Sequence, residues 1–341
     1  MASRHRQHPD ATGDRYRTMT SEMPSARWPS GSLQAAADRM VEIVLGKPDV
    51  VALSLVCLLA EGHLLLQDLP GVGKTTLATA LARTVGLDLR RVQGTADLLP
   101  SDVTGSLVPG EERGQLVFRP GPIFAHLVVA DELNRASPRA QSALLEAMEE
   151  RHVTVDGTTH PLPRPFMVIA TQNPLDPDST FLLPHSQRDR FLVCLSIGYP
   201  DRASEAALLD AGEQTERADA LSPVLAPGEL AAAIEEARRV HLSEATRDYA
   251  LDLVHGTRHH HEVAVGASPR AALALVRAAR ARALFDGRDY VLPDDVKALA
   301  VPVLAHRLVL APSAELAGRS ASAVVGDILT GTSPAPPRRH R

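Results

Sequence analysis

Hydrophobic and polar positions follow two different patterns along this 341-residue chain, and the first pattern covers residues 33 to about 200. There, short apolar runs rich in β-forming residues alternate with segments of helical periodicity. Three of the runs are apolar almost throughout, which is typical of strands buried on both faces of a parallel sheet. The predicted strands are HLLLQ (63–67), LRRVQ (89–93), HLVVAD (126–131), FMVIAT (166–171) and FLVCLSI (191–197). Five such strands separated by helices predict a three-layer α/β domain.

The second pattern begins after residue 200, where the chain becomes rich in alanine and leucine with a helical period. Four or five helices are expected, within ASEAALLDAG (203–212), GELAAAIEEARRV (228–240), SEATRDYALDLVHG (243–256), SPRAALALVRAARARALFDG (268–287) and PDDVKALAVPVLAHRL (293–308). The sequence therefore predicts an α/β domain over residues 32–200 and a small helical domain over residues 201–327.

The two ends of the chain are polar and lack a hydrophobic period. Residues 1–31 are rich in Arg, Ser, Asp and Pro, and we expect a disordered arm. Met19 and Met23 are alternatives to Met1 as the native start. This arm contains no apolar segment of the kind found in signal peptides, and no run approaches membrane-spanning length. Residues 328–341, ending in TSPAPPRRHR, are expected to form a disordered tail.

Composition and charge limit the partners and the cellular location that we expect for the protein. A net charge of −5 gives no reason to expect binding to nucleic acid, so no nucleic-acid partner is predicted. Cys57 and Cys194 both lie in apolar runs and are interpreted as small core residues. A reducing, cytoplasmic location is therefore expected.

The segment QDLPGVGKTT, residues 67–76, carries the first chemical signal. A predicted strand leads into a glycine-bearing turn and then into a helix, which is the arrangement of a phosphate-binding loop. Lys74 would reach the β- and γ-phosphates of a nucleotide, and the Thr75 hydroxyl would bind Mg²⁺. The loop departs from the pattern G-x-x-x-x-G-K-[ST] at its first glycine, where this chain has Asp68.

We interpret Asp68 as a turn residue. Asp tolerates a left-handed or capping conformation better than most residues other than glycine. Asp68 would then lie in the turn that follows the strand, and the phosphate-binding backbone around Gly73 would be unaffected by the missing glycine. On this interpretation Asp68→Gly should be tolerated, with activity within a few-fold of the original.

The segment LVVADELNR, residues 127–135, places Asp131 and Glu132 directly after a buried strand. Ligands bind at that edge of open α/β sheets, where one carboxylate can hold Mg²⁺ and the other can polarise water. A purely capping role is less favoured, because Ser137 and Pro138 already supply the start of the next helix. A later strand ends in polar residues at ATQNP (170–174), where Asn173 can bond both a γ-phosphate and water.

These segments together resemble the MoxR family of AAA+ ATPases. Six segments carry the resemblance in the family's order: GHLLLQDLPGVGKTTLA, RVQGTADLLPSDVTG, GPIFAHLVVADELNRASPRAQSALLEAMEERHVTV, ATQNP, LPHSQRDRF and ASPRAALALVRAARARALFDGRDYVLPDDV. The resemblance covers the chain from about residue 33 to residue 327, and an acidic residue at the position of Asp68 is a variant seen in this family. The resemblance implies a P-loop AAA+ three-layer core with a five-stranded parallel sheet, followed by a small all-α lid.

The resemblance also assigns roles by position. Lys74 corresponds to the Walker A lysine, and Thr75 to the residue whose hydroxyl binds Mg²⁺. Asp131 corresponds to the Walker B residue that binds the metal, and Glu132 to the catalytic base. Asn173 corresponds to sensor 1. Implied metal ligands are Thr75 and Asp131. Implied nucleotide-binding residues are Pro70, Gly71, Val72, Gly73, Lys74, Thr75, Thr76 and Asp131, with Val44, Leu45 and Gly46 at the adenine. For the last three, a plain helix end is an equally good interpretation.

Two arginines complete the implied catalytic set. Arg190 corresponds to the arginine finger that is supplied to a neighbouring subunit, with Arg188 as the alternative finger. The structural alternative for Arg190 is a surface ion pair with Asp189 or a glutamate. Arg270 corresponds to sensor 2. A helix N-terminus disfavours a cation, and a phosphate partner for Arg270 is therefore more plausible than a structural role.

Two inserts and one histidine cluster are interpreted separately. Residues 106–122 are expected to form a hairpin that interrupts a helix, and residues 152–166 a second hairpin around Asp156-Gly157. In the family such hairpins line a ring and contact substrate; simple solvated hairpins are the alternative. RHHHEV (258–263) is not predicted to bind metal, because three adjacent histidines cannot easily point at one ion.

The resemblance implies hydrolysis of ATP with Mg²⁺ by a hexameric ring that remodels, matures or activates a partner protein. Relatives commonly act with partners that carry a von Willebrand factor A domain. A nucleic-acid motor or loader is an alternative function that shares this ATPase core. A nucleotide-dependent binding module with little turnover is a third, and Glu132, Asn173, Arg190 and Arg270 argue against it.

Overall fold

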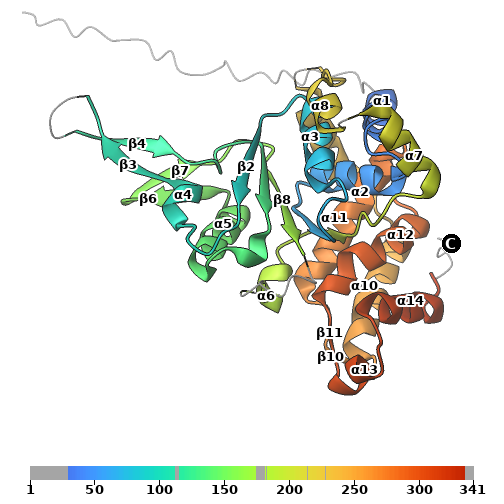
Figure 1. Cartoon of the computed structure of the whole chain (residues 1–341). Helices are drawn as coiled ribbons and strands as arrows, with labels where there is room; N and C mark the ends of the chain where they lie inside the picture. Colours follow the sequence, from blue (N-terminus) through green and yellow to red (C-terminus); the bar gives the residue numbers. More distant parts are fainter. Residues whose placement is uncertain are drawn as a thin grey trace, which may run out of the picture.

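The computed structural model describes residues 30–111, 115–173, 181, 183–212, 214–226 and 228–334. At its centre lies a five-stranded parallel sheet with the strand order β2-β5-β8-β1-β9 (Figure 1). The strands are β1 (Leu64–Gln67), β2 (Leu89–Gln93), β5 (Leu127–Asp131), β8 (Met167–Gln172) and β9 (Val193–Leu195). All four pairings are parallel, and the predicted five-stranded parallel sheet is confirmed.

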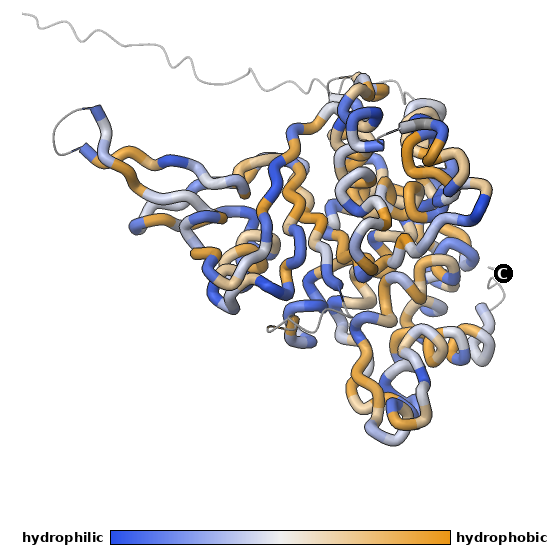
Figure 2. Tube along the Cα trace, in the orientation of Figure 1, coloured by the Kyte–Doolittle hydropathy of each residue, from blue (hydrophilic) through white to orange (hydrophobic). Residues whose placement is uncertain are grey.

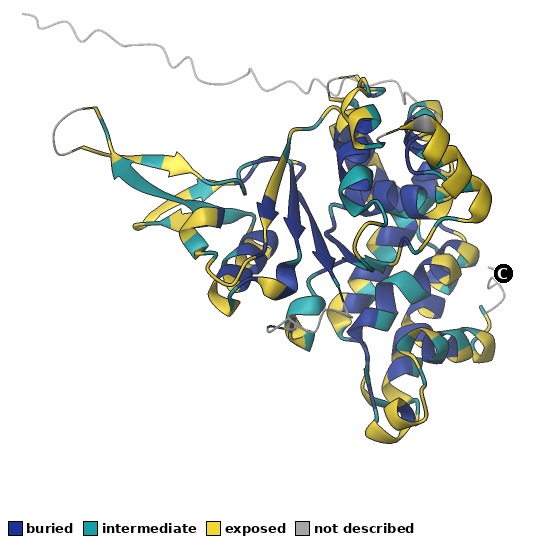
Figure 3. Ribbon diagram, viewed as in Figure 1, coloured by how far each residue is buried: buried dark blue, intermediate teal, exposed yellow. Residues whose placement is uncertain are grey.

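Successive residues of the central strands pack into different cores. In β1, Leu64 and Leu66 join the larger hydrophobic core, whereas Leu65 faces the smaller one. In β5, Leu127 and Val129 point to the larger core and Val128 to the smaller one. Side chains of a strand alternate between the two faces of a sheet, which explains why these strands are apolar throughout. Figure 2 shows the resulting band of hydrophobic residues, and Figure 3 shows its burial.

Helices cover both faces of the sheet and complete three layers. The face of the larger core carries α1 (Ser30–Val41), α2 (Pro48–Leu59) and α3 (Lys74–Val85). The opposite face carries α5 (Pro138–Glu150), preceded by the 3-10 turn η1 (Leu133–Arg135). The short helix α4 (Pro100–Thr104) adds Val103 to the smaller core, and the short helix α6 (His185–Arg188) precedes β9. Among the described helices, none is both long and apolar enough to span a membrane.

The C-terminal part of the chain is helical, as expected, and packs directly on the core. Its helices are α7 (Arg202–Ala211), α8 (Gln214–Asp219), α9 (Glu229–Arg239), α10 (Glu244–His259), α11 (Pro269–Phe285), α12 (Pro293–Leu304), α13 (Pro312–Leu316) and α14 (Ala321–Gly331), with the 3-10 turn η2 (Ala305–Arg307). It also contains a two-stranded antiparallel pair, β10 (Val263–Val265) and β11 (Val309–Leu310), which we did not expect. Lid and core share one hydrophobic core, which includes residues of α2 and α11.

Both expected domain ends need correction. The lid does not stop at residue 327, because α14 continues to Gly331. Val324, Val325 and Ile328 on this helix are buried, so its apolar face holds the last turns on the lid. At the other end α1 begins at Ser30, within the predicted arm of residues 1–31. The rest of that arm, and residues 335–341 of the predicted tail, lie outside the described residues.

Two hairpins extend from the sheet on the side of α4 and α5 (Figure 1). The second pairs β6 (His152–Val155) with β7 (Thr158–Pro161) across Asp156 and Gly157, whose positive φ angles of 48° and 76° fit the predicted turn. The first pairs β3 (Gly105–Pro109) with β4 (Leu116–Pro120). This hairpin follows α4 but does not interrupt a helix, since turns connect it to β5.

Candidate active site

The phosphate loop lies between the end of β1 and the start of α3. Gly71 and Gly73 have positive φ angles of 81° and 88°, and a Cβ atom at either position would meet no atom within 4 Å. Helix α3 begins at Lys74, so the free N–H groups of its first turn face the same open space. This cradle has the backbone form that binds phosphate.

The Lys74 side chain crosses the base of this loop. Its Nζ donates a hydrogen bond to the backbone carbonyl of Asp68 at 2.9 Å. Partial burial lowers the pKa of Lys74, and the carboxylates of Asp68, Asp131 and Glu132 oppose that shift. The three carboxylates therefore favour the charged form of Lys74, which is the form that can bind a phosphate.

Our interpretation of Asp68 as a turn residue is wrong. Asp68 is not among the non-glycine residues with positive φ, and its side chain is buried. Its Oδ1 accepts hydrogen bonds from Ser196 Oγ (2.9 Å) and the Gly198 N–H (3.1 Å), and its Oδ2 accepts one from the Ile197 N–H. Asp68 therefore joins the phosphate loop to the segment that follows β9, about 130 residues later.

Asp131 and Glu132 lie at the end of β5, where the sequence places them. The Thr171 hydroxyl, on the neighbouring strand β8, donates to Asp131 Oδ1 at 2.6 Å. Thr171 Oγ1 also accepts a hydrogen bond from the backbone N–H of Glu132 at 2.8 Å. Glu132 has a left-handed backbone (φ 50°), which is rare for a residue other than glycine and marks a held conformation. One threonine thus fixes both carboxylate-bearing residues.

Strand β2 contributes two polar side chains that sequence reasoning missed. Arg91 pairs with Asp131 Oδ2 at 2.6 Å, and Gln93 Nε2 donates to Glu132 Oε2 at 3.3 Å. Gln93 is the register partner of Asp131 in the parallel pairing of β2 with β5. The sequence signal that could have identified Arg91 and Gln93 is that they are polar residues at the end of the strand that pairs with β5. Arg135 also pairs with the Glu132 carboxylate, at 3.0 Å.

The predicted Mg²⁺ ligands have suitable chemistry. Thr75 and Asp131 supply a hydroxyl and a carboxylate, the hard oxygen donors that Mg²⁺ prefers. Asp131 already attracts a positive partner, Arg91, to one of its oxygens. The donor set therefore fits a divalent cation.

Asn173 follows β8, which lies between β5 and β1 in the sheet. The predicted sensor residue is therefore placed between the carboxylates of β5 and the phosphate loop of β1. Its backbone carbonyl accepts a hydrogen bond from Asn134 Nδ2 at 3.4 Å. Pro174 of the same motif lies outside the described residues.

A pocket of about 190 Å³ opens beside the phosphate loop. Val44 and Leu45, predicted at the adenine, both line it. Gly46 lies between Leu45 and Lys47, has a positive φ of 70°, and packs against Ser204 of α7. The remaining lining residues are Ile43, Lys47, Gly71, Val72, Gly73, Thr76, Ile197, Gly198, Pro200, Leu208 and Gln214. The pocket combines an apolar wall with the phosphate cradle, which suits a nucleotide.

Arg190 and Arg270 lie close together, but at the other edge of the sheet. Both pair with Glu149 in the last turn of α5, at 3.1 and 2.5 Å respectively. Arg270 Nη1 also lies 4.0 Å from Asp189, which is held at 2.8 Å by the buried Arg307 of the lid. Within the described chain, the partner of Arg270 is therefore a carboxylate and not the phosphate loop.

The hydrogen bonds around β9 define this edge. The Leu192 N–H, two residues after Arg190, donates at 2.8 Å to the carbonyl of His63, which immediately precedes β1. The ring of His63 in turn contacts the Met148 carbonyl near the end of α5. The four-residue strand β1 spans about 13 Å, so Arg190 lies near the start of this strand, whereas the phosphate loop follows its end.

Arg188 points to a different place from Arg190. It lines a separate cavity between β9 and the lid, together with Cys194 and His306. Its Nε is buried without a hydrogen-bond partner among the described residues. Burial raises the pKa of the Cys194 thiol to about 12, and the nearby charge of Arg188 only partly offsets this. The two arginines that the sequence left as alternatives therefore face different surroundings.

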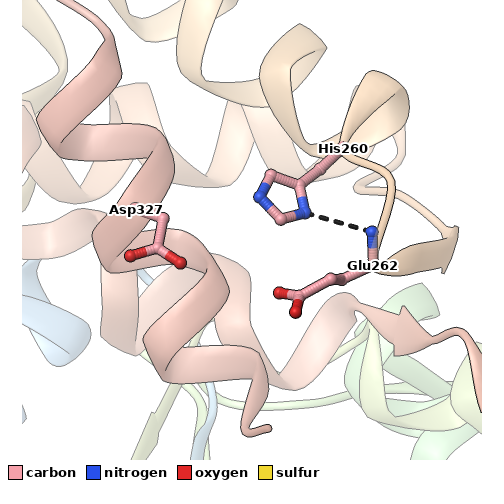
Figure 4. A group of neighbouring side chains, drawn as sticks. All are labelled: His260, Glu262 and Asp327. Carbon is pink, nitrogen blue, oxygen red and sulfur yellow. Dashed lines mark hydrogen bonds between the residues drawn. The ribbon is translucent and has the colours of Figure 1, made fainter. Parts of the chain in front are cut away.

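His260, Glu262 and Asp327 are the one group of described residues with the spacing of metal ligands (Figure 4). Two of them belong to the segment RHHHEV, which we predicted not to bind metal. Arg319 Nε pairs with Glu262 at 3.0 Å, and Arg319 Nη2 pairs with Asp327. The His260 Nδ1 accepts the Glu262 backbone N–H. A single arginine thus pairs with both carboxylates in this structure. That this segment binds no metal ion stays a prediction.

Comparison with known proteins agrees with this geometry. Residues 63–193 match the ATPase family associated with various cellular activities (AAA), and residues 255–328 match the AAA lid domain. The chain is 45% identical over 298 residues to YeaC, an uncharacterized protein of Bacillus subtilis, covering 87% of this chain and 93% of YeaC. It is 40% identical over 289 residues to chaperone MoxR1 of Mycobacterium tuberculosis, covering 82% and 76% of the two chains.

A crystal structure of a candidate ATPase from Cytophaga hutchinsonii has the same fold. It superposes with a TM-score of 0.84 at 34% identity and covers 90% of this chain and 96% of its own. The two family matches, the length of the aligned relatives and this superposition all agree. The chain belongs to the MoxR family of AAA+ ATPases.

Proposed function

We propose that this ATPase binds ATP with Mg²⁺ at the edge where β1, β5 and β8 end, and uses hydrolysis to remodel a partner protein. The observation that carries the proposal is the Thr171 hydroxyl, which bonds both Asp131 and the backbone of Glu132 beside the phosphate loop. Such a fixed pair of carboxylates next to a phosphate cradle suits phosphoryl transfer to water.

Each residue of this edge has a distinct task. The phosphate loop and Lys74 bind and orient the β- and γ-phosphates through N–H groups and one positive charge. Thr75 and Asp131 would hold Mg²⁺, which supplies a Lewis acid that neutralises phosphate charge. Glu132 accepts a proton from the attacking water, and Asn173 orients that water against the γ-phosphate.

A neighbouring subunit completes the site. Arg190 and Arg270 lie together at the edge where the strands begin, away from Lys74 of the same chain. Two arginines that serve ATP from that position must serve the ATP of another copy. This supports a homo-oligomer, and we propose the hexameric ring that is usual for this family. Arginines that neutralise the transferring phosphoryl group accelerate NTP hydrolysis by about 10³ to 10⁵.

The partner is expected to be a protein. The name chaperone MoxR1 of a close relative supports a chaperone-like role. The hairpins β3–β4 and β6–β7 project from the core on one side, where a client or a ring pore would meet them (Figure 1). A von Willebrand factor A domain partner remains our specific proposal. We also propose a cytoplasmic location, which both unpaired cysteines support.

Lys74→Ala tests the nucleotide site, with Lys297→Ala on the exposed face of α12 as the matched control. Calorimetry should show that Lys74→Ala abolishes ATP binding, because it removes the charge that faces the phosphates. The control should bind ATP like the original protein. Unchanged affinity in Lys74→Ala would contradict the assignment of the site.

A further inference from the structure

Asp68 stands where phosphate loops ordinarily have their first glycine, yet its carboxylate is fully used. It accepts three hydrogen bonds, from Ser196 Oγ and from the consecutive N–H groups of Ile197 and Gly198. Gly198 has a left-handed backbone (φ 64°), and this turn lets two successive N–H groups converge on one carboxylate. Glycine at position 68 would leave these donors without an acceptor.

The partners of Asp68 are also part of the nucleotide pocket. Ile197 and Gly198 line it together with Val44 and Leu45, the residues predicted at the adenine. From the other side, Lys47 Nζ donates to the carbonyl of Tyr199 at 2.8 Å. The segment 196–199, which includes the wall residues Ile197 and Gly198, is therefore held by both Asp68 and Lys47, and three of these four hydrogen bonds go to Asp68.

The phosphate side of the site uses a different part of Asp68. Lys74 Nζ bonds the Asp68 backbone carbonyl, which any residue at this position would retain. The hydrogen bonds of the Asp68 side chain thus all go to residues 196–198, whereas the hydrogen bond to the phosphate-binding lysine comes from the Asp68 backbone. The carboxylate reaches Lys74 only through its charge.

We infer that Asp68 is a positioning residue that sets the base-side wall of the nucleotide pocket and thereby the affinity for the nucleoside part of the ligand. The inference rests on the proposed nucleotide site. It implies that restoring the general glycine pattern weakens binding of adenine nucleotides while inorganic phosphates still bind. Asp68 is not part of the reacting set, because it reaches the ligand only through Ile197 and Gly198.

The test compares ADP with inorganic tripolyphosphate as ligands for the full chain. Calorimetry gives the Kd of ADP, and competition against ADP gives the Kd of tripolyphosphate, both with Mg²⁺. Asp68→Gly should weaken ADP binding by about tenfold or more, since it removes hydrogen bonds to a charged group. The Kd of tripolyphosphate should change by less than about threefold, because the Lys74 contact is to the backbone.

Two further variants separate positioning from general stability. Asp68→Asn keeps one acceptor oxygen but turns an amide N–H toward an N–H donor. Its affinity for ADP should therefore lie between those of the original protein and Asp68→Gly. Asp295→Asn alters another buried carboxylate, which pairs with Arg288 at 2.6 Å in the lid, and should lower the melting temperature without changing the ratio of the two Kd values.

The possible outcomes are distinct. If Asp68→Gly and Asp68→Asn lost affinity for ADP and tripolyphosphate equally, the inference would be overturned, because Asp68 would then act through the phosphate loop. Unchanged ADP affinity in both variants would overturn it as well. If the original protein bound no ADP, the proposed site itself would be wrong, and this inference would fall with it.

Discussion

Arg190 and Arg270 share one acid in the isolated chain: both guanidinium groups pair with the carboxylate of Glu149, although 80 residues separate them in sequence. The shared partner is half-exposed, and the two pairs lie at the surface, where ion pairs contribute about 1 kcal/mol or less. Such weak pairs hold the arginines together without preventing their transfer to a stronger anion. We interpret Glu149 as a resting partner that a neighbouring subunit's phosphate replaces.

Glu149→Gln should therefore leave the fold intact and make the arginines easier to engage. We expect an unchanged melting temperature, and ATPase activity that reaches its maximum at a lower protein concentration. Glu150→Gln, at the exposed next position of α5, is the control and should behave like the original protein. Loss of turnover in Glu149→Gln alone would mean that Glu149 takes part in the reaction.

Glu132→Gln should bind ATP normally and lose hydrolysis by about 10² or more, because the amide keeps the shape of the side chain but accepts no proton. Nucleotide affinity by calorimetry and phosphate release measure the two effects separately. Near-normal turnover would show that another residue activates the water.

Thr171→Val should lower kcat by about tenfold with little change in the Kd of ATP, because it removes the hydroxyl that holds Asp131 and Glu132. Thr84→Val is an isosteric control in α3, since the buried Thr84 hydroxyl makes no hydrogen bond among the described residues. That control should keep both activity and stability. Equal activity of Thr171→Val and Thr84→Val would show that the Thr171 hydroxyl does not position Asp131 and Glu132 for the reaction.

The stability of the core should fall in acid because of His63. Burial lowers the pKa of this histidine to about 3, compared with about 6.5 in the unfolded chain. Protonation therefore favours unfolding, so its contribution is fully present above pH 6.5 and is lost as pH falls from about 6.5 toward 3. Each pH unit in that window costs up to about 1.4 kcal/mol per histidine.

Urea denaturation at pH 7.5 and pH 5 measures this effect, with His63→Gln as the comparison. The variant should be less stable at pH 7.5, since it loses the contacts with Met148 and Val168, but should lose less stability between the two pH values. An identical pH dependence in both proteins would assign the acid sensitivity to other groups, such as His306.

Local sequence predicted the parts of the site that depend on local structure. The buried strands are apolar on both faces, and parallel strands end at one edge, so Lys74, Asp131 and Asn173 had to lie near one another. The role of Asp68 was not predictable in this way, because its partners lie about 130 residues later and only the pairing of β1 with β9 brings them close.

The same limit explains the other omissions. Thr171 was visible as a polar strand end, but its two hydrogen bonds depend on the register of β8 beside β5. Glu149 meets Arg190 only when the sheet brings the start of β9 near the end of α5, and it meets Arg270 only after the lid packs against the core. The pairing of β10 with β11 joins two- and three-residue strands that are too short for a periodic signal.

The central claim, that each ATP site is shared between two copies of the chain, has a direct test in mixed assemblies. Arg190→Ala and Glu132→Gln proteins should each be nearly inactive alone. Mixed together, they should recover part of the ATPase activity, because an intact Glu132 site can then meet an intact Arg190 from its neighbour. Normal turnover of Arg190→Ala alone would move the role to Arg188. If mixed assemblies form but no activity returns, the shared site is contradicted.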